Sequence, residues 1–250
     1  MFRAFFKHLM IYASAAVFLA VAGHTPTRSA GPLRIVAEHY PPYEMKMPVD
    51  GLQGFDYEVA IEVFQRLDIP VEIVFLPWKR ALVETENGET LGILTCAHRP
   101  ERESFILFSD PISSFTSGFY YRQGFDSAPI RDVDDITGRR VASVSGYESF
   151  KELQKLGANP TEVQTTTQAI KMLMTGRFDY FYAGKETTDF QIRQLGHTGS
   201  FHFVPVDKRP FHFCFSKAYP GGREIAEKFN RALSDVKTDG TYDAIHEKYR

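Results

Sequence analysis

Two segments of the chain combine residue types and positions that could bind a charged ligand. Ser145–Ser149 follows a predicted strand and opens a predicted helix. Backbone N–H groups at a helix start, together with the positive end of the helix dipole, suit an anion such as a carboxylate; the alternative is an ordinary N-capped helix. Glu38 stands at the end of another predicted strand, and ligands of open α/β sheets bind beyond the carboxyl ends of strands; the alternative is a solvated strand end.

Other chemistries lack the residues that they need. The eight histidines show neither a His-x-x-x-His spacing nor a cluster with cysteine, so we expect no metal site. The two cysteines are too few for a four-cysteine zinc site or a disulfide-based scaffold. No Gly-x-Ser-x-Gly, P-loop or Gly-x-Gly-x-x-Gly motif occurs, so nothing indicates acyl transfer or nucleotide binding, and we expect no cofactor.

The composition is that of an ordinary globular protein. The 250 residues are 43% hydrophobic and 24% charged, with 29 basic and 31 acidic residues and a formal net charge of −2. This balance excludes a disordered or collagen-like chain, and it argues against a protein that coats nucleic acid or binds membranes through a basic patch. The length permits one large domain or two small ones.

The first thirty residues have the three-part pattern of a secretory signal peptide. Arg3 and Lys7 precede an apolar run over residues 9–22, which is shorter than the roughly 20 residues that a spanning helix needs. A membrane anchor is the alternative. We expect cleavage after Ala22 or Ala30; since residues 1–30 hold three basic and no acidic side chains, the remainder has a net charge of −5. This remainder should be exported to an oxidising compartment and soluble there, because no later apolar stretch is long enough to span a bilayer.

The remaining residues alternate between strand and helix patterns. In Phe55–Leu67, apolar residues recur at four-residue spacing, which indicates a helix with one apolar face. Strands are predicted at Leu33–Glu38, Val71–Leu76, Leu91–Ala97, Ile106–Phe108, Arg140–Val144, Asp179–Tyr182, Phe201–Val206 and Phe211–Ser216. Further helices are predicted at Lys79–Asn87, Glu148–Leu156, Thr167–Thr175, Lys185–Leu195 and around Ile225–Val236. Such alternation predicts α/β layers with mainly parallel sheets flanked by helices.

Five short motifs, taken in order, resemble the extracytoplasmic solute-binding proteins of family 3, the polar amino acid type. The motifs are Arg34–Glu38 followed by Tyr40–Glu44, Gly54–Ala60, Arg99–Arg102 followed by Phe108–Pro111, Gly138–Gly146, and Asp239–Asp243. Each is weak alone, but together they extend over residues 33–243. The resemblance implies the type II periplasmic binding protein fold.

This resemblance implies two lobes, joined by hinge strands near Ser113–Ser117 and Val206–Pro210. Lobe 1 would comprise residues 31–115 and 208–250, and lobe 2 residues 116–207. The lobes would close by a hinge motion on a small polar ligand, an amino acid or a related compound that bears a carboxylate. A periplasmic monomer would then deliver this ligand to an ABC importer in the inner membrane.

The resemblance also implies a set of ligand-binding residues. Arg102 would pair with a ligand carboxylate through the two parallel donors of its guanidinium; the alternative is a surface ion pair with Glu101 or Glu103. Glu38 would meet a ligand cation, and aromatic residues could stack on the ligand or bind a cation on their faces; for these and for Thr95 the alternative is core packing. The full set is Glu38, Tyr40, Tyr43, Trp78, Thr95, Ala97, Arg102, Ser145, Tyr147, Glu148, Ser149, Gly184 and Lys185.

One position departs from the family pattern. Relatives place an aspartate at the position of Gly184, where it binds the α-ammonium group of the ligand. We therefore expect this ammonium partner to be missing, or to be replaced by Glu38, Glu148 or Glu186. Lys185 in the cleft would favour an anionic ligand instead.

Several alternatives stay open on this fold. Cys96 and Cys214 would lie on neighbouring strands of lobe 1, either as a disulfide or as two buried thiols. A dehydratase-like periplasmic enzyme would need a general base such as Glu38 or Glu148; the sequence shows no dedicated acid–base pair, so we expect no enzyme. A module that presents its ligand to a separate sensor is a further alternative.

Overall fold

The computed structural model describes residues 31–125, 130 and 132–249, so the predicted signal peptide lies outside the described residues. The strands are β1 (Leu33–Ala37), β2 (Val71–Phe75), β3 (Gly92–Ala97), β4 (Ile106–Arg122), β5 (Val141–Val144), β6 (Thr161–Val163), β7 (Tyr180–Gly184) and β8 (Phe201–Ser216). The helices are α1 (Phe55–Arg66), α2 (Trp78–Glu86), α3 (Glu148–Lys155), α4 (Thr166–Met174), α5 (Lys185–Gln194), α6 (Gly222–Thr238) and α7 (Thr241–Glu247). Short 3-10 helices cover Pro100–Arg102 and Asp134–Ile136.

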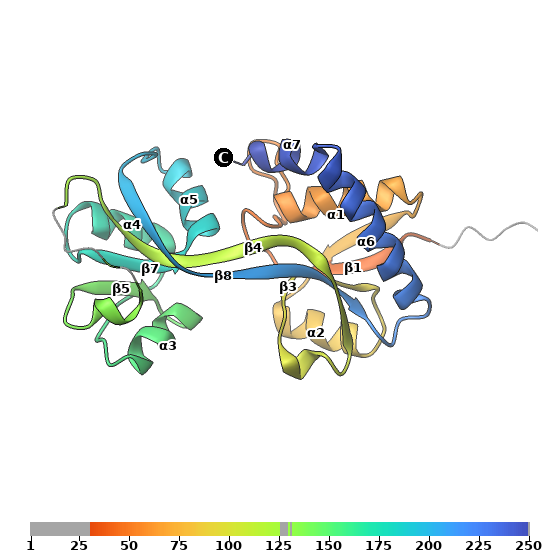
Figure 1. Ribbon diagram of the computed structural model, residues 1–250, viewed down its shortest axis with the longest axis horizontal. Helices are drawn as coiled ribbons and strands as arrows, with labels where there is room; N and C mark the ends of the chain where they lie inside the picture. Colours follow the sequence, from red (N-terminus) through yellow and green to blue (C-terminus); the bar gives the residue numbers. More distant parts are fainter. Residues whose placement is uncertain (1–30, 126–129, 131, 250) are drawn as a thin grey trace, which may run out of the picture. The chain divides into compact units, whose positions relative to one another are not determined.

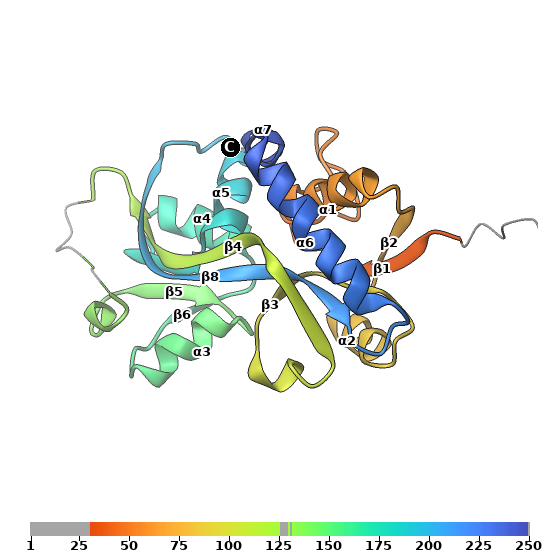
Figure 2. The ribbon, with the colours of Figure 1, turned by 45° about the vertical axis from the view of Figure 1, so that its right-hand side comes forward.

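The strands of the described chain form one mixed sheet in the order β2-β1-β3-β8-β4-β7-β5-β6. At one end β1 pairs in parallel with β2 and β3, and at the other end β5 pairs in parallel with β6 and β7. The central pairs, β3–β8, β8–β4 and β4–β7, are antiparallel. Figures 1 and 2 show two α/β lobes, with β4 and β8 running side by side from one lobe to the other. The predicted two-lobed α/β fold with hinge strands is thus confirmed.

The hinge strands β4 and β8 are much longer than the sequence pattern predicts. β4 has 17 residues and β8 has 16, where the pattern predicts three short strands. Pro111 and Pro210 look like strand ends in the sequence, because proline lacks the N–H that a ladder needs. In the structure Pro111 lies between two register shifts of the β4–β8 ladder, and such irregularities accommodate proline within a strand.

Helices cover both faces of the sheet in each lobe (Figure 1). In lobe 1, α1 and α6 pack with β1, β3 and β8 on one face, and α2 packs on the other. In lobe 2, α4 and α3 cover opposite faces. Burial of Phe55, Val59 and Val63 in α1 agrees with their four-residue spacing. The sequence pattern predicts only a turn at α7, because a helix of seven residues is too short to show a periodicity.

Gly54 positions the loop that follows β1. Its φ is +114°, and a Cβ atom there would lie 2.3 Å from the carbonyl oxygen of Tyr43. Both the backbone conformation and the close approach therefore require glycine. The loop folds back on the start of α1 and holds Tyr43 fully buried in the core of lobe 1.

Cys96 on β3 and Cys214 on β8 form a disulfide, which decides between the two states that the sequence left open. Their Cα atoms are 5.9 Å apart, although 118 residues separate them in sequence. Both side chains are completely buried. The bond therefore ties the end of β3 to a hinge strand inside lobe 1.

The lobe boundaries at residues 115/116 and 207/208 are our proposal. They fall within the β4–β8 ladder, where Thr116 pairs with Lys208, next to a register shift between Ser117 and Gly118. In the part of the chain that the structure describes, none of the helices has both the length and the apolar character needed to cross a membrane.

Candidate functional site

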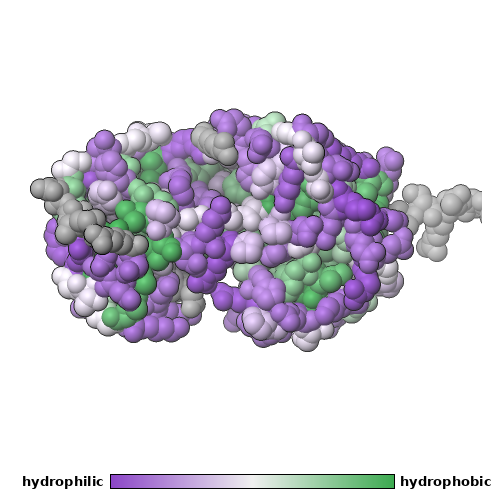
Figure 3. All heavy atoms as spheres, in the orientation of Figure 1, coloured by the Kyte–Doolittle hydropathy of each residue, from purple (hydrophilic) through white to green (hydrophobic). Residues whose placement is uncertain are grey.

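The main candidate site is a pocket of about 430 Å3 between the lobes, which we call the small pocket. Figure 3 shows that the surface is hollowed between the lobes and that mainly hydrophilic residues flank the hollow. The pocket is lined by Glu38, His39, Tyr40, Phe115, Ser117, Tyr147, Ser149, Glu152, Gly184, Thr187 and Arg209. Five residues of the predicted set are among them: Glu38, Tyr40, Tyr147, Ser149 and Gly184.

The rings of Tyr40 and Phe115 line the small pocket, and Phe211, outside the lining, packs against both of them; we call these three rings the aromatic wall. Tyr40 stacks on the buried Tyr43 with 5.1 Å between ring centroids, and Phe211 lies edge-on to Tyr43 at 5.2 Å. Phe115 continues the row at 5.9 Å from Phe211. Burial, reinforced by neighbouring acidic groups, raises the pKa of the Tyr40 phenol, so its hydroxyl stays protonated at physiological pH.

The charged groups of the small pocket are mostly acidic. Glu38 is exposed and has no hydrogen-bond or ion-pair partner among the described residues. Glu152 accepts a hydrogen bond from the Tyr182 hydroxyl at 2.9 Å. Arg209 is paired with Asp207, so its positive charge is already compensated. The field in the pocket therefore favours a cation.

Lobe 2 presents the start of α3 to the small pocket. Tyr147 is the N-cap of this helix, and its side chain is 53% exposed. The Ser149 Oγ lies 2.8 Å from the Ser143 Oγ, which holds it against β5. The backbone N–H of Ser145 donates to a carbonyl of β6, so it is already used. The side chain of Glu148 lies outside what the structure describes.

Thr95 belongs to a carboxyl cluster made of the buried Glu44, Asp56 and Thr95 together with the partly buried Ser113, and it is absent from the lining of the small pocket. The Thr95 hydroxyl bonds to Glu44 and to Asp56 Oδ2, and Ser113 donates to the same Asp56 oxygen at 2.8 Å. A hydroxyl has one proton, so it bridges two carboxyl groups only when one of them is protonated and donates to it. Burial raises the pKa of both groups, that of Asp56 to about 7 and that of Glu44 well above its usual range. The raised pKa values of both carboxyl groups agree with a cluster that holds a proton.

Arg102, Ala97 and Trp78 form a separate group near the end of β3. The guanidinium of Arg102 lies over the Trp78 ring, 5.0 Å from its centroid, and its Nη1 donates to the Ala97 carbonyl at 2.9 Å. Burial, and then the positive charge of Arg99, lowers the pKa of Arg102. The structure thus brings these three predicted residues together, outside the lining of the small pocket.

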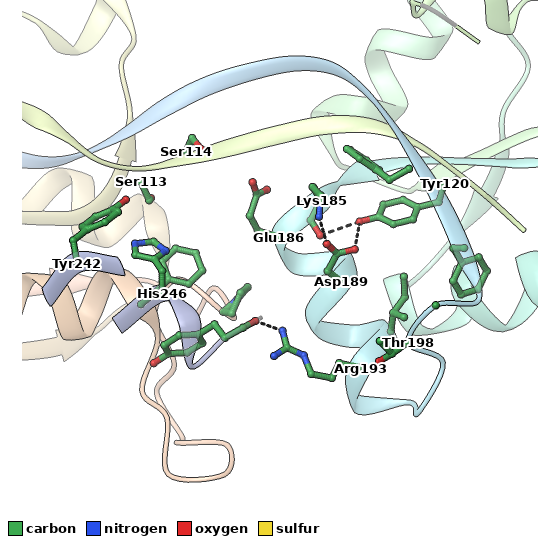
Figure 4. A pocket seen from close by; sticks show the side chains of 17 residues that line it. Ser113, Ser114, Tyr120, Lys185, Glu186, Asp189, Arg193, Thr198, Tyr242 and His246 are labelled. Atoms are coloured by element: carbon green, nitrogen blue, oxygen red, sulfur yellow. Dashed lines mark hydrogen bonds and ion pairs between the residues drawn. The ribbon is translucent and has the colours of Figure 1, made fainter. Parts of the chain in front are cut away.

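Lys185 follows Gly184 directly but lies elsewhere. It lines a second cavity of about 750 Å3, which we call the large cavity, among residues of α5, α7 and β4. Figure 4 shows Lys185 and Asp189 side by side in this cavity, where they form an ion pair. The Lys185 Nζ also lies 5.6 Å from the centroid of the Phe203 ring. Lys185 is therefore not placed to favour an anion in the small pocket.

The polar groups of the large cavity are bonded to one another and to the backbone. Glu186 accepts from the N–H and the hydroxyl of Thr116 at 3.0 and 2.9 Å. Arg193 donates to the carbonyl of Tyr249 (Figure 4). The bond from Arg193 ties α5 to lobe 1. The bonds from Thr116 use Glu186, which the sequence offered as a substitute ammonium partner. Among the described residues, no three or more His, Cys, Asp or Glu side chains are grouped to hold a metal ion.

Sequence reasoning missed six residues that line the small pocket: His39, Phe115, Ser117, Glu152, Thr187 and Arg209. For some of them, the spacing in the sequence could have predicted a place in the site. Phe115 and Ser117 are two residues apart within the predicted hinge segment, so they share one face of a strand. Glu152 follows Glu148 by one helical turn. Arg209 reaches the pocket only through the pairing of β8 with β4, which no local pattern shows.

The relatives found by comparison with known proteins include several amino-acid-binding proteins, and also a membrane-bound lytic murein transglycosylase F of Shewanella sp. (strain MR-4), which is 23% identical over 80% of this chain and 42% of that protein. The L-cystine-binding protein TcyA of Bacillus subtilis (strain 168) is 25% identical over 201 residues, which are 80% of this chain and 73% of that protein. The L-arginine-binding protein of Pseudomonas aeruginosa is 25% identical over 238 residues, which are 90% of this chain and 90% of that protein.

Solved structures and the family match agree with these relatives. An ancestral cationic amino acid solute-binding protein has the same fold, with a TM-score of 0.73 and 22% identity over 88% of this chain and 95% of that one. The family model "Bacterial extracellular solute-binding proteins, family 3" matches residues 33–250. Since this match covers nearly all of the described fold, the chain belongs to family 3 of the bacterial extracellular solute-binding proteins.

Proposed function

We propose that this protein captures a small polar solute, an amino acid or a related compound, in the small pocket and delivers it to an ABC importer of the inner membrane. One observation carries the proposal: the small pocket combines acidic and aromatic side chains from both lobes, beside the hinge strands that run from one lobe to the other. Family membership supports a solute-binding role. The cystine-binding and arginine-binding relatives support an amino acid or a similar compound.

The connection between the lobes supports a cycle in which they close on the solute. The described chain passes between the lobes along β4 and β8, and the ladder between these strands has three register shifts. Such irregularities bend strands locally. A solute that contacts both lobes completes its contacts only when they are closed, so it shifts the population toward the closed state.

Within this proposal the two lobes have different tasks. Glu38 and Tyr40 of lobe 1 bind the solute first, and Tyr147 and Ser149 of lobe 2 complete the site on closure. Arg102, which lies outside the lining of the small pocket, would reach a carboxylate of the solute from the end of β3: its guanidinium has five N–H donors, and the Ala97 carbonyl accepts from one nitrogen. Of the other predicted residues, Tyr43 supports Tyr40 by stacking.

We also propose that the working protein is a periplasmic monomer from which residues 1–30 have been removed. The family is one of extracellular proteins, which supports export. The Cys96–Cys214 disulfide adds support, because disulfides persist in oxidising compartments.

A thermal-shift screen of the purified protein tests the proposed function. At 100 times its dissociation constant, a solute that binds only the folded state adds about 2.7 kcal/mol of stability, which raises the melting temperature by roughly 5 to 10 °C. We expect such a shift with at least one amino acid, amine or small carboxylate. A screen of these classes without any shift would reject the proposal, and chemical conversion of a hit, seen by mass spectrometry, would show an enzyme instead.

A further inference from the structure

A neighbouring side chain, and not the backbone conformation, requires glycine at position 184. It is the N-cap of α5, with φ −73° and ψ 132°, a conformation that every L-residue adopts easily. A Cβ atom on Gly184 would nevertheless lie 2.3 Å from Cε2 and 2.7 Å from Cζ of Phe115. The ring of Phe115 therefore occupies the space that any side chain at position 184 would need.

The Phe115 ring also determines which chemical group a bound ligand contacts beside Gly184. Phe115 is one end of the aromatic wall, and its neighbour in that wall, Phe211, is 5.9 Å away. A ligand beside Gly184 meets the Phe115 ring, and the pocket carboxylates belong to other elements, Glu38 on lobe 1 and Glu152 on α3. An ammonium group placed there would face this ring where a carboxylate side chain at position 184 could have accepted its N–H donors, and each donor left unsatisfied costs about 1 to 3 kcal/mol.

A different kind of cation fits this arrangement. Guanidinium and alkylated ammonium heads are weakly hydrated and are attracted to aromatic faces by about 0.5 to 2 kcal/mol. Glu38, which has no partner among the described residues, supplies the opposite charge. The aromatic wall and the acidic field together therefore suit an organic cation with a planar or alkylated head.

We propose that Phe115 and Gly184 act as one specificity determinant, by which the small pocket selects an organic cation that lacks an α-ammonium group. The aromatic wall binds the charged head, Glu38 and Glu152 balance its charge, and Phe115 excludes an acidic side chain from position 184. This inference rests on the proposed function, since it names the solute class of the same pocket.

Matched pairs of solutes that differ only in the α-ammonium group test the determinant by isothermal titration. One pair is L-arginine and 5-guanidinopentanoate; the other is Nε-trimethyl-L-lysine and 6-(trimethylammonio)hexanoate. In the wild-type protein the member without the α-ammonium group should bind at least tenfold more tightly in one pair or both. Equal or tighter binding of the α-amino acid in each pair that binds would overturn the inference.

Variants of Gly184 and Phe115 test the contribution of each residue to solute selection. Gly184→Asp alone should weaken binding at least tenfold, because the new side chain meets the Phe115 ring. The double variant Phe115→Ala/Gly184→Asp frees that space and should reverse the preference toward L-arginine. If the double variant does not fold, Phe115→Leu keeps most of the bulk without the π face and should weaken binding of the cation about three- to tenfold.

A matched control is Phe203→Leu, which removes a ring from the large cavity and should leave binding unchanged. Wild-type affinity in Phe115→Leu would reject the inference while leaving the proposed function intact. So would a wild-type protein that binds neither pair but binds a neutral amino acid. If no compound of the pairs or of the thermal-shift screen binds, the proposed function itself fails.

Discussion

Reduction of the Cys96–Cys214 disulfide is expected to lower the free energy of unfolding by about 4 to 5 kcal/mol. The bond closes a loop of 118 residues, and a loop of that length costs the unfolded chain much conformational entropy. The loop contains all of lobe 2, so the bond fastens both ends of the hinge connection to lobe 1. Urea unfolding with and without a phosphine reductant measures the difference through the midpoint at constant slope.

A double variant, Cys96→Ala/Cys214→Ala, controls for side effects of the reductant. Its urea midpoint should lie below that of the oxidised wild type and should not respond to the reductant. The disulfide account fails if the oxidised and reduced wild-type proteins unfold at the same urea concentration.

The second large effect concerns the carboxyl cluster, which should make the protein less stable as the pH rises from about 4 to 7. Burial raises the pKa of Asp56 from 3.8 to about 7, so in this range the folded protein holds a proton that the unfolded chain has lost. Stability falls with pH wherever the folded state binds more protons. The contribution of Asp56 is roughly 4 kcal/mol, is fully present below pH 4 and is lost above pH 7.

Asp56→Asn isolates this contribution, because the amide keeps the shape of the side chain without its charge. The urea midpoint of the variant should fall less than that of the wild type between pH 4 and 7, so that their difference favours the variant more at pH 7. Glu72→Gln on the exposed side of β2 is the matched control and should follow the wild type. Parallel pH profiles for wild type and Asp56→Asn would contradict a buried, proton-holding Asp56.

Local periodicity predicts most elements of this fold within one or two residues. It works for α1, because Phe55, Val59 and Val63 face one core and repeat at helical spacing. It fails for the hinge strands, because their stability comes from pairing between residues about 100 positions apart, such as Thr116 and Lys208. A local pattern cannot contain that partner, and Pro111 disguises the strand further.

The residues of the candidate site likewise divide into those that the local sequence predicts and those that depend on partners far away in the sequence. Glu38 and Tyr40 could be predicted because a strand end and the aromatic residues just after it are adjacent in sequence. Thr95 could not be placed correctly, because its hydroxyl is taken by Glu44 and Asp56, which lie 51 and 39 residues away in sequence. The size of the Phe115 ring explains Gly184 only once β4 and β7 are known to pair.

The solute is expected to occupy the small pocket and not the large cavity. Two threonines allow a test with the same substitution: Thr187 lines the small pocket, and Thr198 lines the large cavity. Replacement by tryptophan fills either space with a bulky ring. The measurement is isothermal titration of both variants with the compound that gives the largest thermal shift. We expect Thr187→Trp to weaken binding at least 100-fold and Thr198→Trp to bind within twofold of the wild type; the reverse result would contradict the account.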